Sequence, residues 1–152
     1  IAEGALRLAT DYAQIRRTFG KPIAEHQAIA LKLGEMVTRA RAARLLTLDA
    51  AAAFDRGERC DMEAGMAKYF ASEAALENST ESLRIHGAYG YSAEYGSERY
   101  FRNARAPIIY EGTTQIHKMM QAEHALGYRS LNGRDGEVSP ITSWAPVLAA
   151  RG

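Results

Sequence analysis

Apolar residues recur along most of this chain at steps of three and four, the spacing that places side chains on one face of an α-helix. At the start of the chain the apolar stripe consists of Ile1, Ala5, Leu8, Tyr12 and Ile15. Residues 18–22 contain a glycine and a proline, which interrupt helices. The pattern therefore predicts a first helix that residues 18–22 bring to an end.

A second, longer helix is predicted over residues 24–54. Its apolar positions alternate steps of four and three, which is typical of the buried stripe in an antiparallel bundle. These positions are Ile29, Leu33, Met36, Ala40, Ala43, Thr47, Ala50 and Phe54. Gly57 follows directly and is suited to end the helix, because glycine readily adopts the left-handed conformation of a C-cap.

A third helix is predicted over residues 62–85, with Asp61 as its N-cap. Its apolar side consists of Met66, Phe70, Ala74, Leu76 and Leu83. A glycine-rich irregular turn then leads to a short basic helix over residues 97–104 and a last helix over residues 114–126. No segment is predicted as a strand.

The expected fold class is all-α: an up-and-down four-helix bundle with an extra short helix and an irregular C-terminal tail. Residues 1–128 form the expected helical domain. Residues 129–152 contain glycines and prolines without periodicity, which predicts the tail. We expect Trp144 in this tail to dock on a partner surface or a neighbouring subunit.

Composition narrows the possible functions. The chain has 152 residues, enough for one domain with a real core. Its formal net charge of +1 gives no electrostatic footprint for nucleic acid or an anionic membrane. The single cysteine, Cys60, excludes an internal disulfide and is compatible with a reducing compartment.

Targeting signals are also absent from the sequence. No apolar run approaches the roughly 20 residues of a membrane span, and no signal peptide is visible. The first residue is Ile1, already within a helical pattern, so we expect the chain to be a piece of a longer protein.

Candidate chemistry concentrates in residues 106–117, where Glu111 follows the apolar residues 108–110. We expect these residues to form a wall that excludes water, and a desolvated carboxylate is a stronger base. Gly112 permits close approach of a ligand, and Thr113 can cap the following helix. A general base at Glu111 is one interpretation, and a glutamate in a loop that merely precedes a helix is the other.

Three segments resemble one enzyme family. The stretch Tyr-Glu-Gly-Thr-Thr-Gln-Ile at residues 110–116 resembles the Tyr-Glu-Gly-Thr-x-x-Ile signature of the acyl-CoA dehydrogenases. Residues 12–23 resemble the family's Tyr-x-x-x-Arg-x-x-Phe-Gly-Lys-Pro segment. Residues 85–91, with the basic residues 98–105 behind them, resemble its Gly-Gly-x-Gly-Tyr turn and following helix. Three motifs in the family's order make the resemblance specific over residues 1–128.

This resemblance implies an oxidoreductase that uses FAD to dehydrogenate an acyl-CoA thioester between its α and β carbons. Glu111 would remove the α-proton while the β-hydride passes to flavin N5. The backbone N–H of Glu111, with a flavin ribityl hydroxyl, would bind the thioester oxygen. Tyr110 and Gly112 would line the acyl pocket.

The resemblance also implies the cofactor contacts. Arg16, Thr18 and Phe19 match residues that hold the FAD of a neighbouring subunit, and arginine suits a pyrophosphate because its planar fork donates two hydrogen bonds. Thr113 and Gln115 match contacts to the FAD of the same subunit. The remaining matches are His26, Gln27, Arg84, Gly87 and Ala88.

Two positions in this set differ from the family pattern. Arg84 stands where the family has glutamine, and Ala88 where it has a second glycine. The alternative reading for Arg16 is a helix-terminal arginine in solvent, and for His26 and Gln27 it is a helical cap.

A metal site is not expected. No glutamate is followed by a histidine three residues later, as a di-iron bundle would require. His117 and His124 share a helix face but are separated by roughly 10 Å of helical rise, too far to ligate one ion.

For the whole enzyme the resemblance implies an electron-transfer flavoprotein as acceptor, a homodimer or homotetramer, and a location in the cytoplasm or mitochondrial matrix. The family's amino-terminal helical and middle β domains are not in this sequence, so the fragment alone is expected to be inactive. Three alternatives remain: a dehydrogenase of carrier-protein thioesters, an acyl-CoA oxidase, and a non-catalytic helical interaction module. Glu111, Arg16 and Thr113 together argue against the last, because a scaffold needs none of them.

Overall fold

The computed structural model of the chain describes residues 1–128, so the predicted tail and Trp144 lie outside the described residues. The described part is almost entirely helical, which confirms the all-α fold class. Its α-helices are α1 (Ala2–Ile15), α2 (Gln27–Asp55), α3 (Asp61–His86), α4 (Ser97–Arg105) and α5 (Thr114–Ala125).

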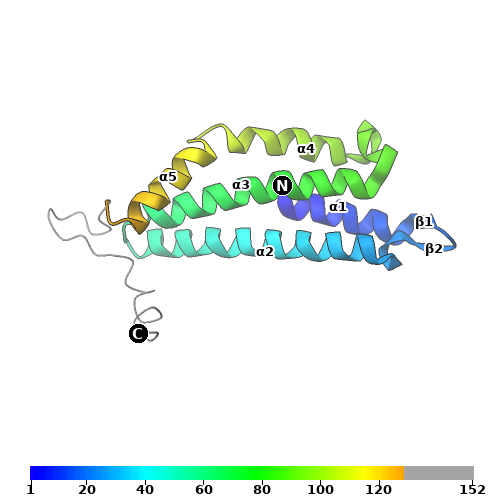
Figure 1. The fold of residues 1–152 in the computed structure, drawn as a ribbon, viewed down its shortest axis with the longest axis horizontal. Coiled ribbons are helices and arrows are strands. Elements are labelled where there is room, and N and C mark those ends of the chain that lie inside the picture. The colour runs from blue at the N-terminus through cyan, green and yellow to red at the C-terminus, as the bar shows by residue number, and fades with distance from the viewer. Residues whose placement is uncertain (129–152) are drawn as a thin grey trace, which may run out of the picture.

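The helices form an elongated bundle around α3 (Figure 1). Helices α1 and α2 lie against α3, and α1 begins near the middle of the bundle. The fourth position is shared, because α4 packs along the C-terminal part of α3 and α5 packs along its N-terminal part. The predicted four-helix bundle with an extra short helix is therefore confirmed, with α4 and α5 following one another along the same side of α3.

Small side chains make up much of the core. The buried residues of α1 are Ala2, Ala5, Ala9 and Ala13. These alanines allow the backbone of α1 to approach its neighbours closely, while Leu6, Leu8 and Tyr12 are half-buried at its flanks. The predicted stripe is thus rotated: Ile1 and Ile15, which belonged to it, are 47% and 78% exposed.

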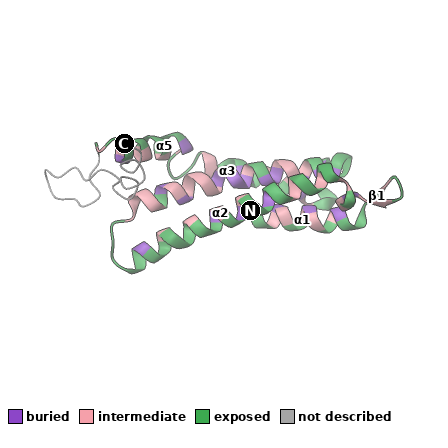
Figure 2. Ribbon diagram, turned by 60° about the horizontal axis from the view of Figure 1, so that its bottom comes forward, coloured by how far each residue is buried: buried purple, intermediate pink, exposed green. Residues whose placement is uncertain are grey.

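On α2, only the middle part of the predicted apolar stripe is buried. Met36, Ala40 and Ala43 are buried, whereas Thr47 is exposed and Phe54 is 72% exposed. Because α1 begins beside the middle of α2, it does not cover the C-terminal half of that helix (Figure 1). Figure 2 shows this half of α2 as largely exposed.

Buried polar side chains tie the helices together, and the apolar pattern did not predict them. Asn78 of α3 is fully buried and donates to the carbonyl oxygen of Met36 at 2.9 Å. Ser97, the first residue of α4, donates to Ser82 Oγ of α3 at 3.0 Å. Asn78 and Ser97 therefore keep a hydrogen-bond partner after losing water.

The helix ends agree with the sequence in one case and differ in two. Gly57 follows α2 in the left-handed conformation, with φ at +71° and its N–H on the Phe54 carbonyl, so it ends the helix as predicted, although Arg56 occupies the C-cap position itself. Asp61 is not the N-cap of α3, because Cys60 occupies that position and Asp61 is the first helical residue. Asp61 instead accepts a hydrogen bond from Arg59 at 2.7 Å, which lowers the pKa of its carboxyl.

The second helix also begins later than predicted. Residues Ile23–Glu25 form a short 3-10 turn, and α2 starts at Gln27. Ahead of it, β1 (Arg17–Thr18) and β2 (Lys21–Pro22) pair as a small antiparallel hairpin, where no strand was predicted. Phe19 and Gly20 form its two-residue tip with φ of +51° and +80°, the signs that a type I′ turn requires. Phenylalanine is unusual at the first tip position of such a turn, so the turn residues did not predict the hairpin.

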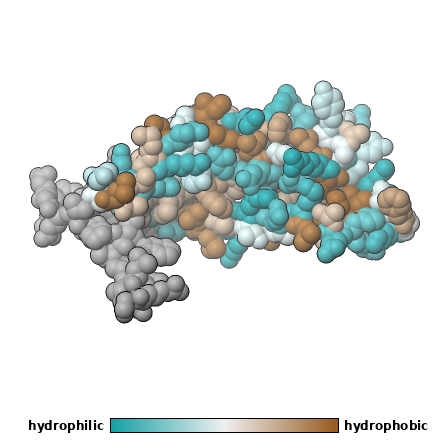
Figure 3. Space-filling view, viewed as in Figure 1, coloured by the Kyte–Doolittle hydropathy of each residue, from teal (hydrophilic) through white to brown (hydrophobic). Residues whose placement is uncertain are grey.

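The described surface carries many apolar side chains. Brown, hydrophobic residues lie between hydrophilic ones over the face seen in Figure 3. On α2 alone the exposed large apolar residues are Leu31, Val37, Leu45, Leu48 and Phe54. Among residues 1–128, no helix is both long and apolar enough to cross a membrane.

Candidate active site

The loop between α4 and α5 holds Glu111 in an unusual backbone conformation. Its φ is +56°, and Gly112 beside it has φ of +86°. Within residues 1–128 the only other non-glycine residue with positive φ is Phe19. Such a conformation costs on the order of 1–2 kcal/mol for a residue with a Cβ, and it concentrates at functional sites. Both strained residues are ones that the sequence predicted to be functional.

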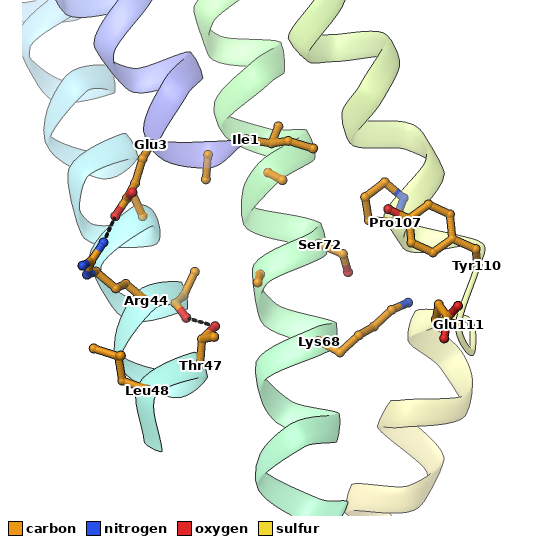
Figure 4. Close-up of a pocket in the computed structure, with 15 residues that line it drawn as sticks. Ile1, Glu3, Arg44, Thr47, Leu48, Lys68, Ser72, Pro107, Tyr110 and Glu111 are labelled. Carbon is orange, nitrogen blue, oxygen red and sulfur yellow. Dashed lines mark hydrogen bonds and ion pairs between the residues drawn. The ribbon is translucent and has the colours of Figure 1, made fainter. Parts of the chain in front are cut away.

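Glu111 lies on the rim of a cavity of ≈ 680 Å³ between the loop and helices α1, α2 and α3 (Figure 4). Much of the cavity wall consists of small residues: Ala40, Ala43, Ala71, Ser72 and Ala75. Of the two residues expected to line an acyl pocket, Tyr110 lines this cavity and Gly112 does not.

The predicted apolar wall before Glu111 is absent from this domain. Residues Ala106–Ile108 form a 3-10 turn, and Ile109 and Tyr110 are 69% and 53% exposed. Glu111 itself is exposed. The desolvation that would strengthen this base is therefore not provided by residues 1–128.

Two side chains from neighbouring helices contact the main chain of the loop. Lys68 of α3 donates from Nζ to the carbonyl oxygen of Gly112 at 2.5 Å. His117 of α5 donates from Nε2 to the carbonyl oxygen of Glu111 at 3.4 Å. Thr113 occupies the N-cap position of α5 as predicted, but its hydroxyl makes no capping hydrogen bond. No sequence motif singled out Lys68, because its role depends on α3 passing beside the loop.

A second cavity, of ≈ 390 Å³, is lined by residues of the β1–β2 hairpin and of the C-terminal ends of α1 and α3. The hairpin lies at the opposite end of the bundle from α5 (Figure 1). This cavity brings together six of the predicted cofactor residues: Arg16, Thr18, Phe19, His26, Gly87 and Ala88. Thr18 Oγ1 and His26 Nε2 are 3.0 Å apart and hydrogen-bonded. The Phe19 ring is 97% exposed at the hairpin tip.

The other four predicted cofactor residues lie elsewhere. Gln27 begins α2 and is exposed, outside the lining of this cavity. Arg84 pairs with Glu81 on α3, and its side chain is 63% exposed. Thr113 and Gln115 lie beside Glu111 at the start of α5. From Lys68, next to the Glu111 loop, to Gly87 the rise along α3 is about 28 Å, so the predicted cofactor residues form two separate groups.

An aromatic cluster borders the second cavity, and the sequence analysis did not single it out. Tyr12, His86, Tyr89 and Tyr95 contact one another through their rings. The Arg16 guanidinium lies 5.6 Å from the centroid of the Tyr89 ring. Burial raises the pKa of the Tyr12 hydroxyl. These ring contacts join the C-terminal part of α1 to the C-terminal end of α3, and both helix ends line this cavity.

No three histidine, cysteine, aspartate or glutamate side chains within residues 1–128 lie close enough to hold a metal ion. His124, which is almost fully buried, lies 3.7 Å from Asp61 across the contact between α5 and α3.

Comparison with known proteins identifies the family. The family described as "Acyl-CoA dehydrogenase, C-terminal domain" matches residues 1–126. The chain therefore belongs to the acyl-CoA dehydrogenase family and corresponds to its C-terminal helical domain.

Individual relatives agree. An acyl-CoA dehydrogenase of Bacillus subtilis is 47% identical over 84% of this chain and 34% of its own length. The caffeyl-CoA reductase–Etf complex subunit CarC of Acetobacterium woodii is 45% identical over 79% of this chain and 32% of its own. Among solved structures, butyryl-CoA dehydrogenase from Megasphaera elsdenii superposes with a TM-score of 0.81 at 39% identity, over 82% of this chain and 33% of that chain. The chain thus spans about a third of the length of the relatives it matches.

Proposed function

We propose that this chain is the C-terminal part of an FAD-dependent enzyme that dehydrogenates an acyl-CoA thioester, with Glu111 as the base. The Glu111 carboxylate takes the proton from the α-carbon, and the electron pair left behind forms the new double bond as hydride departs from the β-carbon. Both hydrogens leave the substrate, one as a proton and one as hydride. The chemistry that FAD supplies when bound is acceptance of that hydride at flavin N5.

The observation that carries this proposal is the strained backbone of Glu111 at the rim of a cavity that is lined in part by small side chains. A loop that merely leads into a helix has no reason to hold a glutamate at φ of +56°. The small side chains on the α2 and α3 part of the cavity wall, Ala40, Ala43, Ala71 and Ala75, leave room for an acyl chain. The main-chain N–H of Glu111 is proposed to bind the thioester oxygen and to stabilise the developing enolate.

FAD fits the residues at the opposite end of the bundle. A dinucleotide needs donors for its pyrophosphate and flat side chains for its rings. Arg16, Thr18 and His26 supply donors around one cavity, and the exposed Phe19 ring supplies a flat face. A Cβ built on Gly87 would meet no non-neighbouring atom within 4 Å, so the space beside this glycine is open to a ligand.

The predicted cofactor-binding residues form two separate groups in one domain, and this supports an oligomer. The cavity at Arg16 and the loop at Glu111 are separated by about 28 Å of α3, which is hard to bridge with one cofactor held entirely by this domain. We propose that Thr113 and Gln115 contact the FAD of their own subunit and that the Arg16 group holds the FAD of a neighbour. A homodimer or homotetramer follows. The exposed apolar residues of α2 are consistent with further contacts in the whole protein.

An electron-transfer flavoprotein is the proposed redox partner. The Acetobacterium woodii relative is named as a subunit of a complex with Etf. The same name favours a second candidate reaction, reduction of an enoyl-CoA, because the groups that remove a proton and a hydride also serve the reverse direction.

Glu111→Gln in the full-length enzyme tests the proposed base. Glutamine keeps the shape of the side chain but accepts no proton, so anaerobic flavin bleaching by acyl-CoA substrates should slow on the order of 10³-fold with FAD still bound. Glu94→Gln, at an exposed glutamate of the turn Ala93–Tyr95, is the matched control. Bleaching at the wild-type rate in Glu111→Gln would place the base elsewhere. A wild-type enzyme that never bleaches would favour the interaction-module alternative.

A further inference from the structure

We propose that Lys68 and His117 are positioning residues, which together hold the Glu111 backbone in its strained conformation. This inference rests on the proposed function, because the position of the Glu111 carboxylate affects the rate only if Glu111 acts as the base. It names residues outside all three motifs that define the family resemblance. Its evidence is the main-chain geometry of the loop and the side chains that contact it.

The loop needs external support. Glu111 and Gly112 both have positive φ, so two successive residues depart from the conformations that most residues prefer. For glycine this costs little, but for Glu111 the cost is on the order of 1–2 kcal/mol. A residue in such a conformation keeps it only where surrounding contacts hold it. Among residues 1–128, no backbone–backbone hydrogen bond involves Glu111 or Gly112.

Lys68 supplies the first contact. Its side chain extends from α3 toward the loop that carries Tyr110 and Glu111 (Figure 4). The ammonium donates to the Gly112 carbonyl oxygen at 2.5 Å. A hydrogen bond from a charged donor is roughly twice as strong as one between neutral groups. The Gly112 carbonyl is therefore tied to α3, the central helix of the bundle.

His117 supplies the second contact. Its Nε2 faces the Glu111 carbonyl oxygen at 3.4 Å, and because a carbonyl only accepts, Nε2 carries the hydrogen. The ring lies between two glycines: a Cβ at Gly112 would be 3.0 Å from Nε2, and one at Gly65 would be 3.3 Å from Nδ1. The imidazole is thus packed between the loop and α3, which fixes its orientation.

The two contacts act on adjacent peptide groups. With the carbonyls of Glu111 and Gly112 held by α5 and α3, neither the Glu111–Gly112 peptide plane nor the Gly112–Thr113 peptide plane can rotate freely. The Glu111 side chain and the Glu111 N–H, which lies in the preceding peptide, are oriented relative to the first of these planes by the ψ and φ angles of Glu111. Loss of either contact should therefore misplace the carboxylate by a fraction of an ångström to about 1 Å, and a shift of that size can cost about 10²-fold in rate.

The test uses the full-length enzyme with Lys68→Met and His117→Leu, which remove each donor. Flavin reduction at saturating acyl-CoA should slow by about 10- to 100-fold in each variant, with KM changed less than about threefold. The isotope effect from deuterium at the α-carbon should rise, because proton removal becomes more rate-limiting. Lys68→Arg and His117→Gln keep a donor and should recover much of the rate.

Lys118→Met is the matched control, because this exposed lysine of α5 lies over the Tyr69 ring, 4.6 Å from its centroid, and does not contact the loop. It should behave as wild type. A role in folding alone would lower FAD content and thermal stability without raising the isotope effect, and that result would overturn the proposal. If Lys68→Met fails to fold, His117→Leu decides, and a wild-type rate and isotope effect there would equally overturn it.

Glu111→Gln, run alongside, separates this inference from the proposed function. If that variant is inactive while Lys68→Met and His117→Leu are fast, Glu111 is the base and the positioning role is wrong. If Glu111→Gln is itself fast, the proposed base fails before the positioning question arises.

Discussion

The Tyr12 ring stacks on the imidazole of His86, with centroids 4.3 Å apart and 22° between the ring planes. Tyr12 belongs to α1 and His86 ends α3, so this pair joins two helices at the hairpin end of the bundle. Tyr89 and Tyr95 extend the cluster around Tyr12. The stack also borders the cavity that contains Arg16 and Phe19.

Truncation of Tyr12 should therefore destabilise the domain. Tyr12→Ala removes the stacked ring and its apolar contacts, and we expect a loss of about 2–4 kcal/mol in the free energy of unfolding. The measurement is urea unfolding of the chain followed by far-UV circular dichroism. Tyr91→Ala, at a ring that is 94% exposed, should change the value by less than about 0.5 kcal/mol. Equal losses in the two variants would contradict a structural role for the stack.

Two glycine substitutions should have opposite effects. A Cβ at Gly90 would lie 2.6 Å from the Leu83 carbonyl oxygen and 3.0 Å from the Leu83 Cα, so the backbone itself must move. Gly90→Ala should cost about 2–3 kcal/mol. At Gly34, inside α2, a Cβ meets nothing within 4 Å. Gly34→Ala should stabilise the domain by about 0.5–1 kcal/mol, because alanine loses less backbone entropy in a helix. Thermal unfolding of both variants checks the pair, and a shift in the same direction would refute the argument.

Glu81 should make stability depend on pH. Burial alone would raise the pKa of this carboxyl, but hydrogen bonds from Lys32 and Arg84 outweigh burial and lower the pKa below its ordinary value of 4.5. A group whose pKa is lowered by folding stabilises the folded state above its unfolded pKa, and this contribution disappears as the pH falls through the folded pKa. Glu81→Gln should therefore cost about 1–2 kcal/mol near pH 7, and the difference from wild type should shrink below about pH 4.5.

The check on Glu81 is urea unfolding of wild type and variant from about pH 3 to pH 7. Glu94→Gln, at an exposed glutamate, should leave the shape of the pH profile unchanged. A constant difference between Glu81→Gln and wild type across this range would mean that the Glu81 charge is not responsible.

The 152-residue chain by itself should not reduce flavin with acyl-CoA. Glu111 is exposed in residues 1–128, and the chain spans only about a third of the relatives it matches, so the parts that would enclose the substrate are expected elsewhere. Purified chain mixed with FAD and acyl-CoA under anaerobic conditions should keep its flavin oxidised. Bleaching at the rate of the full-length enzyme would show that residues 1–152 are sufficient.

Local sequence patterns were enough to predict the helices, the left-handed glycine that ends α2 and the loop that carries Glu111. Each depends on neighbours along the chain: helical periodicity, the conformational freedom of glycine, and a contiguous motif. The hairpin at Phe19 was missed because its tip lacks the usual turn residues, and only pairing of Arg17 with Pro22 and of Thr18 with Lys21 defines it. The Asp61 cap was wrong because the chain enters α3 one residue earlier.

Contacts between distant residues were decided by the tertiary structure alone. Alanines rather than isoleucines face the core in α1, because close approach to α2 and α3 leaves room only for small side chains. Asn78 can be buried because the Met36 carbonyl on another helix accepts a hydrogen bond from its side-chain amide. Lys68 precedes its hydrogen-bond partner Gly112 by 44 positions in the sequence. It reaches the Glu111 loop only because α3 passes beside that loop. The sequence by itself determined which segments are helical and which loop carries the carboxylate. The packing of those helices decided which side chains contact that loop, since such contacts leave no periodic or contiguous signal in the chain.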